Sequence, residues 1–267
     1  MPSLVMQGRS FRAATPEHNV PMTAPTATLD GWLRGSHTGD GRTHPTWRRG
    51  SGPCVVLIHE MPGMTPEVIG FANEVVESGF TVVMPHLFGT PEAPRTLAET
   101  IRTAARVCVS NEFTKLATGV TTPVAGWLRS LARELHAELG GPGVGALGMC
   151  FTGGFALAMM VDESVAAPVV SQPSTPFPVD AKRRADLNLS PADTAKVVDR
   201  VRGGCPVLGL RYASDPATGT RFDTLTELLG DGFLRVEFDG KGHSVLTNDR
   251  QDEGVRRVLE FFDERLR

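Results

Sequence analysis

The sequence predicts an α/β fold, with a mostly parallel central sheet and helices on both faces. From residue 53 onward, short apolar segments typical of buried strands alternate with segments typical of amphipathic helices. The run PCVVLIHE at 53–60 is bounded by Pro53 and Pro62, as is typical of a parallel strand that is buried on both faces. The chain has 267 residues and can bury a large core, so we expect one domain over residues 28–267.

Ahead of this alternation we expect a surface arm and two short strands. Residues 1–27 are rich in Pro, Thr and Ala, which favours a segment laid on the surface. Residues 27–35 and 43–50 predict two strands, because SHTGDGRT between them is typical of a turn.

The remaining elements are predicted from apolar runs and from glycines. FTVVMP, VGALGM and LRVEFDG have the composition of buried strands, whereas Gly79 and the pair Gly140 and Gly141 mark helix ends. A polar stretch at 174–200 interrupts the pattern, and we expect it to cap the site. The expected order after residue 60 is helix 71–79, strand 80–85, helices 97–109 and 122–139, strand 144–149, helix 151–162, strand 167–173, strand 205–214, helix 219–230, strand 234–240 and helix 251–266.

Composition and charge indicate a small-molecule partner. Lys and Arg total 27 against 30 for Asp and Glu, the net charge is -3 and no basic run occurs, so neither nucleic acid nor a membrane is the expected partner. The four cysteines lack CxxC or Cys/His metal spacing, so we expect reduced thiols and no metal. The N-terminal residues lack a signal-peptide core and no run approaches the ~20 apolar residues of a membrane span, so we expect a cytoplasmic protein, monomeric or homodimeric.

Cys150 is the candidate nucleophile. It lies in GALGMCFTGGFALAMM, where an apolar strand run closes and a small-residue helix is expected to begin just after the sulfur. A sharp turn from strand to helix exposes its central side chain and places it at the positive end of the helix, where a thiol ionises more easily. An isolated cysteine in an apolar stretch is more often a buried structural residue, so this prediction depends on the residues around it.

Other chemically capable residues also follow predicted strands. Glu60 follows VVLIH, Asp215 follows LGLRYAS, and His243 lies in the loop GKGHS after LRVEFDG. The carboxyl ends of parallel strands meet at one edge of a sheet, where ligands bind. Asp239 is a rival acid, but we favour Asp215 because it ends a buried strand and can approach the imidazole from the side. The chain order of nucleophile, acid and histidine is that of α/β-hydrolases.

Two competing motifs fail on context. HEMPGM is not the HExxH zinc motif, and His59 and His86 are expected to be structural. Gly143, Gly145 and Gly148 satisfy GxGxxG, but they run into a strand instead of following one, so we expect no dinucleotide and no other cofactor.

In this order, HEMPGM, MPHLFG, GMCFTGG, ASDP and KGHS resemble the dienelactone hydrolase family, a branch of the α/β-hydrolase fold with a Cys-His-Asp triad. The resemblance covers about residues 53 to 266 and implies that Cys150 is the nucleophile, His243 the base and Asp215 the orienting acid. Glu60 matches the family glutamate that pairs with the resting thiol. Met61 and Phe151 match the residues whose backbone N–H groups form the oxyanion hole.

The chain departs from this family at two places. Thr152 stands where the family usually has glycine, two residues after the cysteine. Dienelactone-specific members also hold a substrate carboxylate with arginines, whereas Arg95 and Arg250 here are displaced from those places. The expected function is therefore hydrolysis of a neutral carboxylic ester or lactone through a cysteine thioacyl intermediate. The alternative is a non-catalytic or redox-regulated binding protein on the same scaffold.

Overall fold

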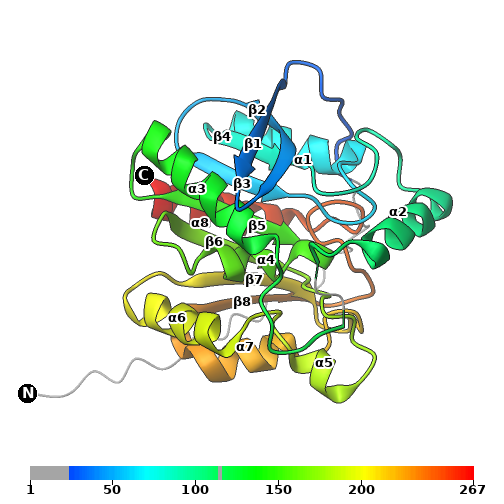
Figure 1. Ribbon diagram of the computed structural model, residues 1–267, viewed down its shortest axis with the longest axis vertical. Helices are drawn as coiled ribbons and strands as arrows, with labels where there is room; N and C mark the ends of the chain where they lie inside the picture. Colours follow the sequence, from blue (N-terminus) through cyan, green and yellow to red (C-terminus); the bar gives the residue numbers. More distant parts are fainter. Residues whose placement is uncertain (1–23, 114–115) are drawn as a thin grey trace, which may run out of the picture.

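The computed structural model describes residues 24–113 and 116–267 and contains an eight-stranded sheet (Figure 1). The strand order is β1-β2-β4-β3-β5-β6-β7-β8, and every neighbouring pair from β4 to β8 is parallel, whereas β1 and β2 are antiparallel to their neighbours. The predicted class, a mostly parallel α/β sheet, is confirmed. The strands are β1 Leu33–Gly39, β2 Arg42–Arg49, β3 Cys54–Ile58, β4 Thr81–Pro85, β5 Val144–Met149, β6 Val165–Ser171, β7 Val207–Tyr212 and β8 Phe233–Phe238.

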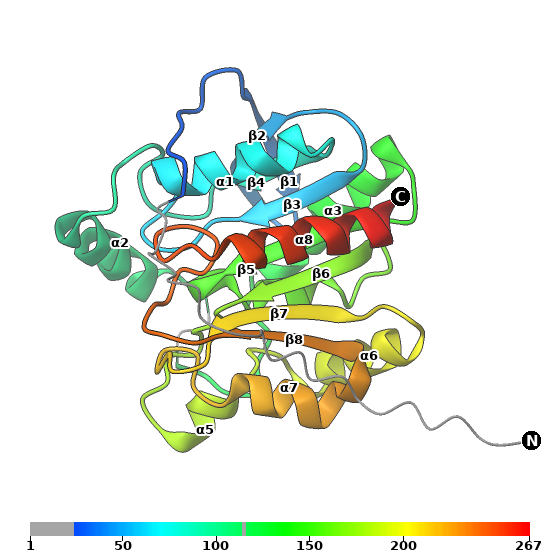
Figure 2. The ribbon, with the colours of Figure 1, turned by 180° about the vertical axis from the view of Figure 1, so that it is seen from behind.

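Helices cover both faces of the sheet, as the sequence predicts. Helices α1 and α8 pack on one face, where Figure 2 shows them in front of the strands. Side chains of α2, α3, α4, α6 and α7 belong to the core on the opposite face. The helices are α1 Pro66–Glu77, α2 Leu97–Val109, α3 Ala125–Leu139, α4 Phe155–Met159, α5 Ala181–Ala185, α6 Pro191–Arg202, α7 Arg221–Leu229 and α8 Asp252–Leu266.

Strand β3 shows why a continuous apolar run is needed at the centre of this sheet. All five of its residues are buried. Val55 and Leu57 pack in the core beneath α1 and α8, whereas Val56 and Ile58 pack in the core of the other face. Because side chains of a strand alternate between faces, a sheet covered on both sides requires apolar residues at consecutive positions.

The turn between the first two strands is shorter than the predicted SHTGDGRT segment. Strands β1 and β2 pair up to Gly39 and Arg42, so only Asp40 and Gly41 form the turn. Both residues have positive φ, 50° and 71°. An Asp-Gly pair tolerates this backbone conformation and matches the twist of a two-residue hairpin, so the flanking polar residues remain in the strands.

One predicted helix start and one predicted polar stretch need correction here. Helix α1 begins at Pro66 instead of residue 71, because Thr65 caps it by accepting a hydrogen bond from the Val68 N–H at 3.4 Å. The stretch 174–200 is not simply a polar excursion, since it contains α5 and most of α6. Helix α6 is capped by Ser190 in the same way, and Val197 is its one buried residue. The composition of this helix is polar overall, which hides it within the polar stretch.

Most of the predicted arm, up to residue 23, lies outside the described residues. Its last part packs on α1, where the Ala27 N–H donates to the Pro66 carbonyl at 2.9 Å. None of the helices in the described ranges is long and apolar enough to cross a membrane.

Candidate active site

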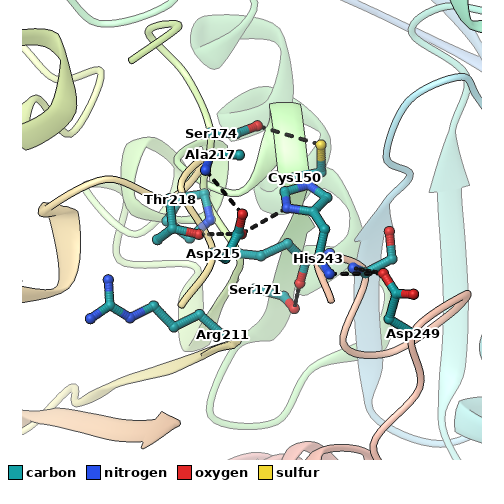
Figure 3. A network of polar contacts seen from close by, with 12 residues as sticks. Cys150, Ser171, Ser174, Arg211, Asp215, Ala217, Thr218, His243 and Asp249 are labelled. Atoms are coloured by element: carbon teal, nitrogen blue, oxygen red, sulfur yellow. Dashed lines mark hydrogen bonds and ion pairs between the residues drawn. The ribbon is translucent and has the colours of Figure 1, made fainter. Parts of the chain in front are cut away.

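The sheet brings the four chemically capable residues to one edge. Glu60, Cys150, Asp215 and His243 follow the carboxyl ends of β3, β5, β7 and β8. One oxygen of Glu60, the sulfur of Cys150 and one ring nitrogen of His243 all lie within 4.8 Å of one another. Asp215 lies behind the imidazole, and Figure 3 shows the imidazole of His243 between the Cys150 side chain and the Asp215 carboxylate.

Cys150 occupies a sharp turn after β5. Its φ is 54°, a left-handed conformation that is unusual for a residue with a side chain. The turn is tight, since a Cβ on Gly148 would lie 2.2 Å from the Thr152 carbonyl oxygen, and one on Gly153 would lie 2.6 Å from Pro173 Cα. Instead of the predicted helix over 151–162, a 3₁₀ turn at Cys150–Thr152 precedes the short helix α4.

Thr152, the departure from the family motif, ties this turn to β3. Its hydroxyl is buried and accepts a hydrogen bond from the Met149 N–H at 3.1 Å. The same hydroxyl lies 3.2 Å from the Ile58 carbonyl and 3.1 Å from the His59 carbonyl, both at the end of β3. Thr152 therefore links the two strand ends that carry the thiol and Glu60, a link that glycine could not make.

His243 is held by Asp215. The imidazole Nδ1 lies 2.7 Å from Asp215 Oδ2, and because an ionised carboxylate only accepts hydrogen bonds, Nδ1 is the donor. The carboxylate is fixed in turn by the Thr218 hydroxyl at 2.7 Å and the Ala217 N–H at 2.9 Å. These bonds orient the ring so that Nε2 is left for the sulfur.

A second aspartate shapes the histidine loop without touching the ring. Asp249 Oδ2 accepts the backbone N–H groups of His243 at 2.8 Å and Ser244 at 3.1 Å. The rival acid Asp239 is exposed, and the contacts of the described residues include none between it and His243. Asp215 is thus the carboxylate that the structure brings to the imidazole.

The thiol and the imidazole favour each other's charged form. Burial alone would raise the pKa of the Cys150 thiol, but the charge and hydrogen bond of His243 outweigh it and lower that pKa below its ordinary value of 9.0. Burial alone would lower the pKa of His243, but the thiolate and the Asp215 carboxylate raise it well above 6.5. Each group therefore favours the charged form of the other: the imidazolium favours the thiolate, and the thiolate favours the imidazolium.

Glu60 lies next to this pair in a polar cage. Its buried carboxylate accepts hydrogen bonds from Ser244 Oγ at 2.9 Å, Gln172 Nε2 at 3.4 Å and Thr247 Oγ1. Arg95 Nη1 approaches it at 3.3 Å. The negative charge of Glu60 opposes ionisation of the thiol, and these donors disperse that charge.

The two displaced arginines have different positions. Arg95 reaches the site, where the same Nη1 also donates to Ser244 Oγ at 2.9 Å and Asn248 Oδ1 at 2.8 Å. Arg250 instead forms a bidentate pair with Glu74, both bonds measuring 2.8 Å, and a further bond with Asp252. The side chain of Arg250 is therefore engaged in ion pairs between elements.

Sequence reasoning missed Ser174, whose hydroxyl lies 3.4 Å from the Cys150 sulfur. Ser174 is on the loop after β6, at the same sheet edge as the other groups, so the strand-end rule could have found it.

The two residues assigned to the oxyanion hole follow β3 and β5. Met61 is partly buried and packs against the core, and Phe151 is buried. The Phe151 ring meets Phe88, Phe113 and Phe155 at centroid distances of 5.5, 5.5 and 6.0 Å. These contacts anchor the backbone beside the nucleophile.

The remaining histidines at this edge are engaged elsewhere. His59 is fully buried, accepts the Leu87 N–H at 3.2 Å, and has a pKa lowered to about 3 by burial, so it is neutral. His86 Nε2 lies 3.1 Å from the Gly89 carbonyl. In the described part of the chain, Glu60, Cys150 and His243 are the one group with metal-ligand geometry, and all three belong to the site above.

The strand order, with helices on both faces and these residues at the strand ends, is that of the α/β-hydrolase fold. A model of the dienelactone hydrolase family matches residues 42–198. This chain belongs to the dienelactone hydrolase family, which supports a hydrolase function. No curated protein sequence matches it.

Solved structures agree on the fold. A dienelactone hydrolase from Anabaena variabilis is 17% identical, with 88% of this chain and 98% of that chain covered and a TM-score of 0.61. A cold-adapted esterase from an Arctic intertidal metagenomic library is 18% identical, with 88% and 93% covered and a TM-score of 0.54. At these identities the likeness concerns the fold.

Proposed function

We propose that this protein hydrolyses carboxylic esters or lactones through a thioester intermediate on Cys150. The observation that carries the proposal is the placement of the Cys150 sulfur and a His243 ring nitrogen within 4.8 Å of each other, with a 2.7 Å bond between the imidazole and the Asp215 carboxylate behind it. A thiolate paired with an oriented imidazolium is suited to attack a carbonyl carbon.

In the first half of the reaction, the Cys150 thiolate attacks the ester carbonyl. The carbonyl oxygen becomes an oxyanion, which the backbone N–H groups of Met61 and Phe151 would hold. The His243 imidazolium then gives its proton to the leaving alcohol, leaving a thioester and a neutral imidazole.

In the second half, the neutral imidazole of His243 takes a proton from water as the water oxygen attacks the thioester carbonyl. The C–S bond breaks, its electron pair returns to sulfur, and the carboxylic acid leaves. The enzyme is back at its thiolate and imidazolium without a further proton transfer.

A neutral substrate fits the charges of the site. Arg95 reaches the site through Glu60, and its guanidinium is already bound to Glu60, Ser244 and Asn248. A substrate carboxylate would compete with Glu60 for this cation. It would also add negative charge beside a thiolate, which is unfavourable in a buried site.

The redox-regulated alternative needs a resolving cysteine. Cys54 begins β3 and Cys205 precedes β7, so both lie at the amino ends of strands, opposite Cys150. Burial raises the pKa of Cys54 to about 12 and also raises that of Cys205. Neither is placed to form a disulfide with Cys150 without movement of the sheet.

Hydrolysis of a short p-nitrophenyl ester by wild type, Cys150→Ala and Cys54→Ser tests the proposal. We expect turnover to vanish in Cys150→Ala and to persist in Cys54→Ser, which alters a thiol at the other end of the sheet. Equal turnover in wild type and Cys150→Ala would refute the cysteine mechanism. A wild type that hydrolyses neither p-nitrophenyl esters nor a panel of lactones would favour the binding-protein alternative.

A further inference from the structure

Ser174 faces Cys150 with both its backbone and its side chain. Its N–H donates to the Cys150 carbonyl at 3.0 Å, and its Oγ lies 3.4 Å from the Cys150 sulfur, within hydrogen-bond range for sulfur. The residue is 6% exposed. The mechanism above leaves this buried hydroxyl unused, although it touches the reacting atom (Figure 3).

The loop that carries Ser174 is held from two sides. On the side of the nucleophile, the Thr175 hydroxyl donates to the Phe151 carbonyl at 2.6 Å. On the other side, the fully buried Arg221 donates to the carbonyls of Pro173, at 3.4 Å, and Pro176. The Ser174 side chain is thus presented to the sulfur by a fixed backbone.

The charged groups around the sulfur come from other elements. His243, with Asp215 behind it, approaches from the loop after β8, and Glu60, with Arg95 behind it, approaches from the end of β3. His243 must give up its proton during turnover, and Glu60 carries no donor when ionised. A thiolate can only accept hydrogen bonds, so opposite a thiolate the Ser174 hydroxyl is the donor.

We propose that Ser174 is a further catalytic residue, whose hydroxyl donates a hydrogen bond to the Cys150 sulfur and stabilises it as the leaving group of thioester cleavage. The catalytic part of this inference rests on the proposed function. When the C–S bond breaks, the electron pair passes to sulfur while His243 keeps the proton taken from water. The Ser174 hydrogen bond then stabilises the new anion without transferring its own proton. The same bond helps to lower the pKa of the thiol in the resting enzyme.

The experiment removes the Ser174 hydroxyl in two pairs of proteins, whose side chains at this position differ in size and shape. Ser174→Ala is compared with wild type, and Ser174→Val is compared with Ser174→Thr, which has nearly the same shape but keeps the hydroxyl. The rate of Cys150 alkylation by iodoacetamide is measured from pH 5 to 10 by peptide mass spectrometry, so that other thiols do not interfere. Turnover of p-nitrophenyl acetate is measured on the same samples.

Removing the hydroxyl should raise the midpoint of the alkylation profile by about one pH unit in both comparisons and lower kcat about tenfold. Identical midpoints within both pairs would overturn the proposal, because a donor to the thiolate must affect its ionisation. Alkylation requires no ester, so the two hypotheses can fail separately. A shifted midpoint in a protein without any hydrolase activity would refute the proposed function and the catalytic role of Ser174. It would support only the hydrogen bond between Ser174 and the thiolate.

Discussion

Replacing Asp215 with asparagine should disable the enzyme by changing the tautomer of His243. In the wild type, Asp215 Oδ1 accepts the Ala217 N–H at 2.9 Å, and Oδ2 accepts both Thr218 Oγ1 and His243 Nδ1 at 2.7 Å. An asparagine has one oxygen. If that oxygen stays with Ala217, the amide NH₂ faces Nδ1 and forces the proton onto Nε2, which can then no longer accept one.

The magnitude follows from these contacts. Loss of a hydrogen bond to a charged group costs about 1.5–3 kcal/mol, which is roughly a 10- to 150-fold effect. Inversion of the tautomer adds to this, and the equivalent change in a serine triad costs about 10⁴ in kcat. We therefore expect kcat/KM of Asp215→Asn to fall by about 10²–10⁴. In the opposite orientation the amide would keep the bond to the imidazole, but its NH₂ group would face the Ala217 N–H, so that two donors would lie against each other.

The assay is steady-state hydrolysis of a p-nitrophenyl ester across pH 5–10. Asp239→Asn is the matched control, since Asp239 lies on the same loop as His243 but is exposed, and its turnover should stay within a few-fold of wild type. Turnover of Asp215→Asn within a few-fold of wild type would refute the assignment of the acid. A large loss in Asp239→Asn alone would transfer the role to that residue.

Three further predictions concern stability and pH dependence. Arg221→Met removes the guanidinium that donates to six backbone carbonyls, three of them in buried contacts, so urea unfolding should show a loss of at least about 3 kcal/mol. Arg256→Met on the surface should leave the midpoint unchanged, and equal midpoints of the two variants would contradict the prediction. Thr152→Val removes the acceptor of a buried N–H and should cost about 1–3 kcal/mol in the same assay, and an unchanged midpoint would show that the hydroxyl does not hold the turn. Because the pKa of Cys150 is lowered, its thiolate persists at pH values below the ordinary pKa of 9.0 and is lost only as pH falls through the lowered pKa. Its alkylation midpoint should therefore lie below 9.0. A profile that coincides with N-acetylcysteine would contradict the ion pair.

The fold was predictable where burial constrains composition on both faces. Strand β3 requires five consecutive buried residues, and this requirement leaves an apolar run that is visible in the sequence. Helix α6 has one buried residue, Val197, so its apolar signal is weak, and the capping pair Ser190 and Pro191 was the remaining clue. The start of α1 was missed for a different reason: its first turn is marked only by the capping residue Thr65 and by Pro66, although six residues of the helix are buried.

By itself, the sequence determined the order of the chemically capable residues along the chain and their positions just after predicted strands. Cys150, Asp215 and His243 each follow a predicted strand, and parallel strands bring such residues to one edge of a sheet. This inference needs only the alternation of elements. It identified the candidate residues but not their contacts.

Only the tertiary structure decided which of these residues meet. The contact of Asp215 with His243, which the sequence had only favoured, the contact of Ser174 with the sulfur and the approach of Arg95 to Glu60 join residues 24 to 35 positions apart. Such contacts depend on strand register and on how each loop folds back over the sheet edge. A shift of a few ångströms in a loop makes or breaks a hydrogen bond while leaving the local sequence pattern unchanged, and that is why the pattern could not contain them.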